Sequence, residues 1–63
     1  MGDESRSVSA AQIQVGRSYR WQEKVFTVLG VERHVSATHL LVVTTYSYGL
    51  LEIHEAEMVW PED

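Results

Sequence analysis

The chain has 63 residues, no cysteine, a formal net charge of −4 and a hydrophobic content of 44%. This length fits one domain, the lack of cysteine excludes disulfides, thiol catalysis and cysteine zinc sites, and the hydrophobic content is too high for a disordered chain. No apolar run approaches the roughly 20 residues of a membrane helix, and MGDESRSVSA at the start lacks the apolar segment of a secretory signal. We therefore expect a soluble, cytoplasmic protein without a membrane partner.

The N-terminal residues predict a tail followed by a helical turn. Residues 1–8 are polar and small, which is typical of a disordered tail. The sequence SAAQ at 9–12 matches a capping box, in which Ser9 and Gln12 satisfy each other's backbone amides. We expect one helical turn at this position.

From Ser18 onward the pattern favours β-structure. Tyr19 and Trp21 alternate with polar residues, as in a half-buried strand. The polar sequence QEK at 22–24 predicts a hairpin loop. The second strand, VFTVLGVERH at 25–34, contains Gly30, and a glycine inside a strand indicates a bulge or a bend.

The remaining elements complete a small barrel. They are a strand at 39–47, a turn at 48–49, a strand at 50–54, a one-turn helix around 54–58 and a short last strand at 59–60, which Pro61 ends. Five short strands with a bent second strand predict an all-β fold, a five-stranded SH3-like barrel over residues 9–61. Closing the sheet would remove its exposed edges. Residues 62–63 are an acidic C-terminal end.

Four short motifs follow one another along the chain: G-x-x-Y-R, V-L-G-x-x-R-H, L-V-V and E-M. Their positions are Gly16, Tyr19, Arg20, Val28, Leu29, Gly30, Arg33, His34, Leu41, Val42, Val43, Glu57 and Met58. In these motifs the chain resembles a family of short, uncharacterised bacterial β-domain proteins. It departs from the family at HVSAT (34–38), which has one extra residue, and at EIHE (52–55), which replaces W-V-R-P. The resemblance implies an SH3-like architecture and no particular activity.

Charge is distributed unevenly along the chain. From Val15 to His34 four basic residues outnumber two glutamates (4 − 2 = +2), whereas residues 50–63 contain five acids and no lysine or arginine, giving −5. A negative protein disfavours phosphate-rich ligands. A basic protein partner, or the basic end of another copy in a homo-oligomer, is a better electrostatic match.

Metal and catalytic chemistry lack a clear motif. His34, His39 and His54 include no closely spaced pair, and a zinc site needs three or four ligands. No serine has the surroundings of an activated nucleophile, and the four glycines are isolated rather than forming a phosphate loop. We expect no enzyme activity, cofactor or metal.

The remaining candidates are aromatic and acidic side chains. We expect Trp21 and Phe26 in the core and Tyr48 exposed in its turn, because a small core needs large side chains. Our prediction is a non-enzymatic protein-interaction module or small regulatory accessory protein that binds a partner through Tyr48, Glu52, Glu55 and Glu57. The acidic end can also be read simply as a solvated terminus. The alternative function is weak nucleic-acid binding through Arg17, Arg20, Lys24 and Arg33.

Overall fold

The structure is a computed structural model that describes residues 6–62. Within this range lie six strands and one 3₁₀ helix: β1 (Val8–Ser9), η2 (Ala10–Gln12), β2 (Ser18–Trp21), β3 (Lys24–Arg33), β4 (Leu40–Thr45), β5 (Gly49–His54) and β6 (Met58–Pro61). The strands are neighbours in the order β1-β6-β2-β3-β4-β5, and every pair is antiparallel. The prediction of an all-β fold is confirmed. No helix in the described range has the length and apolarity needed to cross a lipid bilayer.

The hairpin between β2 and β3 is tighter than the sequence suggested. Trp21 pairs directly with Lys24, so only Gln22 and Glu23 form the turn. Both have positive φ angles, 50° and 65°, as in the turns whose twist matches that of paired strands. Lys24 therefore belongs to a strand and not to the predicted loop, although the turn lacks the usual glycine.

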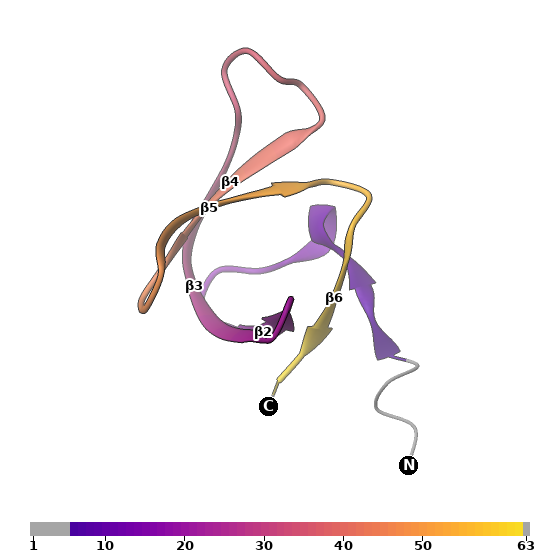
Figure 1. The fold of residues 1–63 in the computed structure, drawn as a ribbon, viewed down its shortest axis with the longest axis vertical. Coiled ribbons are helices and arrows are strands. Elements are labelled where there is room, and N and C mark those ends of the chain that lie inside the picture. The colour runs from indigo at the N-terminus through magenta and orange to yellow at the C-terminus, as the bar shows by residue number, and fades with distance from the viewer. Residues whose placement is uncertain (1–5, 63) are drawn as a thin grey trace.

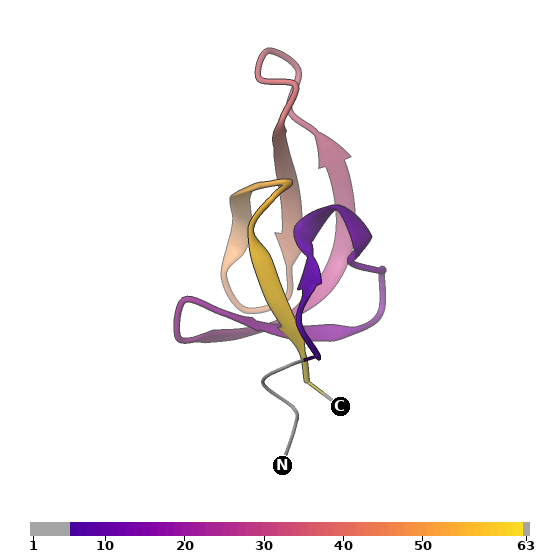
Figure 2. The same ribbon diagram turned by 90° about the vertical axis from the view of Figure 1, so that its right-hand side faces the viewer.

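Strand β3 belongs to both halves of the sheet. Its first residues pair with β2, and from Val28 onward it pairs with β4. The register shifts between Val28 and Gly30, so that Leu29 is an extra residue relative to β4. Such a bulge bends and twists a strand, and β3 curves visibly between its two partners (Figures 1 and 2). The bend predicted at Gly30 is confirmed.

The sheet curls around a single apolar core. Alternate residues of the strands point inward, and the buried hydrophobic residues are Ala10, Tyr19, Trp21, Phe26, Val28, Leu41, Val43, Ile53 and Val59. The buried hydroxyl of Thr45 donates to the Gly49 carbonyl oxygen and accepts from the Tyr48 amide, both at 2.9 Å. Trp21 and Phe26 lie in the core, as predicted.

Two expectations about the N-terminal segment need revision. Val8, at the edge of the expected tail, starts β1 and pairs with Val59, which makes six strands rather than five. Residues 1–5 of that tail lie outside the described residues. The 3₁₀ helix η2 lies in the expected helical segment, but Ser9 makes no side-chain cap, and its backbone pairs with Met58.

The one-turn helix expected before the last strand is instead a simple turn at residues 55–57. Its backbone groups bond to distant segments: Glu55 N–H donates to the His39 carbonyl (2.8 Å), and the Glu57 carbonyl accepts from Ala10 N–H (2.7 Å). The Glu57 N–H donates to the His54 carbonyl (2.9 Å), which closes a single turn that does not continue as a helix. β5 therefore leads directly into β6 (Figure 1), and the ladder ends at the edges β1 and β5 as an open sheet.

Candidate functional site

The outward-facing side of β3, β4 and β5 presents apolar side chains to solvent. The bulge turns both Leu29 and Gly30 outward, since a Cβ on Gly30 would lie 3.9 Å from Cβ of the exposed Thr44. Thr44 in turn pairs with Leu50 of β5. Leu29 is 53% exposed and Leu50 is 67% exposed. One row across the three strands thus contains two large solvent-facing leucines.

The next row along the same strands is acidic at both ends. Glu32 of β3 and Glu52 of β5 both pair with Val42, which lies between them on β4. Both glutamates are exposed and Val42 is half-buried. We call this surface the outer face, and it consists of Leu29, Glu32, Val42, Leu50 and Glu52. It combines apolar contact area with two carboxylates that attract cationic groups.

Two exposed tyrosines adjoin the outer face where β4 turns into β5. Tyr46 is 80% exposed and Tyr48 is 44% exposed. The hydroxyl of Thr45 fixes this loop through its two bonds to Tyr48 and Gly49, and Gly49 has a φ of 70° that favours glycine. Tyr48 is exposed, as predicted, and Tyr46 is more so.

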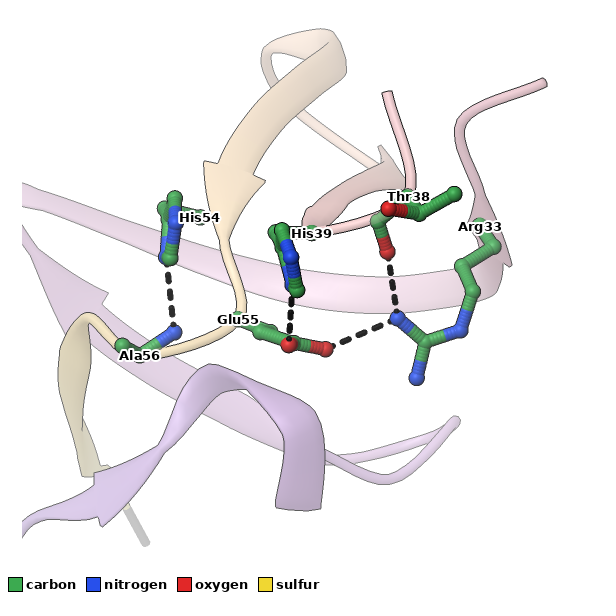
Figure 3. A network of polar contacts seen from close by, with 6 residues as sticks. All are labelled: Arg33, Thr38, His39, His54, Glu55 and Ala56. Atoms are coloured by element: carbon green, nitrogen blue, oxygen red, sulfur yellow. Dashed lines mark hydrogen bonds and ion pairs between the residues drawn. The ribbon is translucent and has the colours of Figure 1, made fainter. Parts of the chain in front are cut away.

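A second polar cluster lies at the opposite end of these strands (Figure 3). Arg33 Nη1 donates to Glu55 Oε1 (2.8 Å) and to the Thr38 carbonyl (2.8 Å), and His39 Nδ1 donates to Glu55 Oε2 (2.9 Å). The hydrogen bond from Arg33, followed by that from His39, lowers the pKa of Glu55 to about 2. Both oxygens of the Glu55 carboxylate thus accept a hydrogen bond from its own chain.

The three histidines do not assemble into a metal site. His39 and His54 stack with ring centroids 6.0 Å apart, but Nδ1 of His54 accepts from the Ala56 amide. His34 accepts the Ser36 amide on Nδ1, and its Nε2 lies 3.6 Å from Glu52. Within the described residues no three histidine, cysteine or carboxylate side chains converge to hold a metal ion.

The predicted partner-binding residues divide into two groups. Tyr48 and Glu52 are exposed beside or within the outer face. Glu55 is bound to Arg33 and His39, and Glu57 accepts a hydrogen bond from the indole Nε1 of the buried Trp21 (2.9 Å). Glu55 and Glu57 therefore hold the fold together, and the structure does not bring the four predicted residues into one surface.

The four basic residues of the alternative function do not all lie together. Lys24 and Arg33 lie at opposite ends of β3. Lys24 lies over the Trp21 ring at 5.5 Å and Arg20 lies over the Trp60 ring at 5.8 Å. Arg20 is 4.0 Å from Glu62, and Arg33 is paired with Glu55. These intramolecular partners do not form the continuous basic groove with stacking aromatics that single-stranded nucleic acids use.

One hollow of about 500 Å³ lies outside these regions, between the N-terminal segment, β2 and β6. Its lining residues are Val8, Gln12, Gln14, Arg17, Tyr19 and Pro61. The Tyr19 hydroxyl accepts a hydrogen bond from the Gln14 amide (3.0 Å). Among the described residues, the polar groups of this lining are one guanidinium, two side-chain amides and one phenol.

Leu29, Glu32 and Leu50 were not predicted as site residues, although the sequence contains a signal for the two leucines. Hydrophobic residues stand next to each other at Val28-Leu29 and at Leu50-Leu51. Neighbouring residues of a strand normally point to opposite faces, so one member of each pair had to face outward.

Comparisons of the chain with protein-family models, with curated proteins and with solved structures find no match. Function is accordingly inferred from the surface chemistry of the described residues.

Proposed function

We propose that this chain is a non-enzymatic protein-interaction module, a small regulatory accessory domain that acts in the cytoplasm. Its binding surface is the outer face of β3, β4 and β5, extended by Tyr46 and Tyr48. The partner has apolar residues together with lysine or arginine. The lack of cysteine in the sequence is compatible with a reducing compartment.

The observation that carries this proposal is the exposure of large apolar side chains on an ordered strand surface. Leu29 and Leu50 lie on strands, where the backbone fixes their positions, and not on a mobile terminus. Apolar side chains gathered on a surface and rimmed by polar residues mark interaction sites. Ordered leucines and tyrosines also lose little conformational entropy on binding, which favours affinity.

The two glutamates of the outer face specify the charge of the partner. Glu32 and Glu52 flank Val42, and Nε2 of His34 lies 3.6 Å from the Glu52 carboxylate. Complementary charge accelerates association and selects among partners. A basic segment is therefore favoured over an acidic one.

We further propose that the curled sheet is an SH3-like barrel. The strand order and the bent β3 support this proposal, as does the short turn that returns the chain from β5 to β6 beside β2. Closure would then come from that turn and from core packing, since no ladder joins β5 to β1 in the described range. Membership of the short bacterial β-domain family is part of the same proposal, supported by its motifs on β2 and β3.

The proposed function is tested by site-specific photo-crosslinking in a lysate of the organism that encodes the protein. A photoreactive residue replaces Leu50 on the outer face, and in the matched control it replaces Val15, which is also exposed (63%) but lies before β2. We expect a discrete protein adduct from position 50 and none from position 15. Charge reversal of Glu32 and Glu52 to lysine should abolish that adduct. Equal labelling from both positions, or none from position 50, would overturn the proposal.

A further inference from the structure

Strand β5 has one backbone edge paired with β4 and one edge that faces away from the sheet. It is the last strand in the sheet order, and its pairing with β4 is regular from Leu40–His54 through Thr45–Gly49. The alternate residues Leu50, Glu52 and His54 are exposed. The chemical question is which backbone groups this free edge offers.

Two hydrogen bonds fix the direction of the backbone groups of β4. His34 N–H donates to the Leu40 carbonyl (2.9 Å), so Leu40 directs its backbone groups toward β3. Glu55 N–H donates to the His39 carbonyl (2.8 Å), so the preceding residue faces the β5 side. Backbone direction alternates along an antiparallel strand. Residues 41, 43 and 45 of β4 therefore bond to β5.

The same alternation identifies the free groups of β5. Leu51 and Ile53 pair with residues 43 and 41, so their N–H and C=O groups point toward β4. Leu50 and Glu52 direct theirs to the open edge. The edge ends at His54, whose carbonyl accepts from Glu57 N–H (2.9 Å). The described residues provide no backbone partner for Leu50 or Glu52 on that side.

Apart from the charge of Glu52, the usual protections of an edge strand are missing from β5. Natural edges carry lysine, proline or a bulge, or are very short. β5 contains neither lysine nor proline, pairs without a register shift and is six residues long, whereas the other edge, β1, has two residues. Its one charged residue, Glu52, repels acidic strands and attracts basic ones.

We propose that β5 binds an extended basic segment of another protein as an added antiparallel strand. The added strand bonds to the backbone of Leu50 and Glu52. It places lysine or arginine on the outer face beside Glu52, and apolar residues on the opposite side beside Leu51. Strand addition combines backbone bonds for affinity with alternate side chains for specificity. This inference rests on the proposed function and names the binding mode and partner chemistry of the same surface.

A second copy of this chain fits the same edge poorly. A symmetric antiparallel pair that uses both Leu50 and Glu52 places Glu52 directly opposite, or diagonally beside, Glu52 of the other copy. Like charges directly opposite each other destabilise a sheet, and diagonal neighbours are still within reach of long side chains. Residues 50–63 include no lysine or arginine to offset that repulsion. Charge complementarity therefore selects a basic partner strand.

The test is a titration of the full chain with a capped heptapeptide in which valine and lysine alternate. Binding is observed through the amide NMR signals of the protein. In the proposed register the lysine amides bond to β5 and the valine amides face away. We expect the amide signals of Leu50 and Glu52 to shift on titration. N-methylation of the lysines should weaken binding by about tenfold or more, whereas N-methylation of the valines should leave it unchanged. A peptide alternating valine and glutamate is the charge control and should not bind.

The protein-side variants are Glu52→Pro and Glu52→Gln. Proline is compatible here because the Glu52 N–H is not used by β4 and the preceding Leu51 is extended. Glu52→Pro should abolish binding, and Glu52→Gln should only weaken it. Should Glu52→Pro fail to fold, the N-methylated peptides give the answer alone. Three results would each overturn the inference. They are equal binding of both methylated peptides, no binding by the parent peptide, and a concentration-dependent dimer through β5. Photo-crosslinking at position 50 decides the proposed function separately, since a partner can lie on the outer face without adding a strand.

Discussion

The guanidinium of Arg33 lies 2.8 Å from the Glu55 carboxylate and ties the end of β3 to the turn between β5 and β6. The same carboxylate holds His39, so one side chain joins both ends of the loop between β3 and β4 to a turn that is distant in the sequence. Glu55 was expected to face a partner. Its contacts make it a structural residue, with consequences for stability that can be measured.

Stability should fall at acidic pH because of Glu55. The folded-state pKa of Glu55 is about 2 and its ordinary value is 4.5, so the unfolded chain binds the proton first as pH falls. The stabilising contribution is complete above about pH 4.5 and is lost progressively toward pH 2. Thermal unfolding of the wild type and of Glu55→Gln should differ most near neutral pH and converge near pH 2. A constant difference across that range would contradict this assignment.

Removal of Glu57 should destabilise the fold through Trp21. Trp21 is a buried residue whose indole N–H donates to Glu57, and a buried donor without a partner costs about 1–3 kcal/mol. Glu57→Ala should therefore lower the free energy of unfolding, measured with denaturant, by an amount in that range. The control is the same change in a Trp21→Phe background, where no donor is left unpaired and the effect should shrink. Equal losses in both backgrounds would exclude the hydrogen bond as the cause.

Glycine in the first hairpin should stabilise the protein. Glu23 has a φ of 65°, and a left-handed conformation costs a residue other than glycine roughly 1–2 kcal/mol. Glu23→Gly should raise the free energy of unfolding by about 1 kcal/mol, somewhat less than that cost because glycine also gains freedom in the unfolded chain. Glu23→Ala removes the same charge without relieving the backbone, and it should not stabilise. A gain in both variants would assign the effect to charge instead.

Hydrogen exchange should alternate along β5. Leu51 and Ile53 direct their amides to β4 and should exchange slowly, whereas Leu50 and Glu52 direct theirs to the open edge and should exchange rapidly. Amide exchange followed by NMR at neutral pH gives the four rates. Slow exchange at Leu50 and Glu52 in the free protein would show that this edge is already covered.

The elements with strong periodicity could be predicted from the sequence. The alternation at Tyr19 and Trp21 predicted a half-buried strand, and the β-branched run predicted β4. The glycine inside β3 predicted the bend. Each of these features is local, and each follows from side-chain shape and burial. A strand of two residues such as β1 has no periodicity to detect, because its pairing with β6 depends entirely on tertiary position.

The candidate site could be predicted only in part. Glu52 and Tyr48 were identified because turns and strand faces can be read from local sequence. The roles of Glu55 and Glu57 depend on Arg33, His39 and Trp21, which are separated from them by many residues. Local sequence shows that a carboxylate is present but not which distant donor it meets.

Because β3 pairs with both β2 and β4, it limits where the backbone can be cut without loss of the fold. Lys24–Arg33 pairs with β2 along its first part and with β4 along the rest. A cut within it would therefore break the one strand that connects the two parts of the sheet. New termini in the loops at residues 34–39 or 46–48 leave β3 uncut. Circular permutants opened in these loops should therefore retain the native sheet, whereas a permutant opened inside β3 should not assemble.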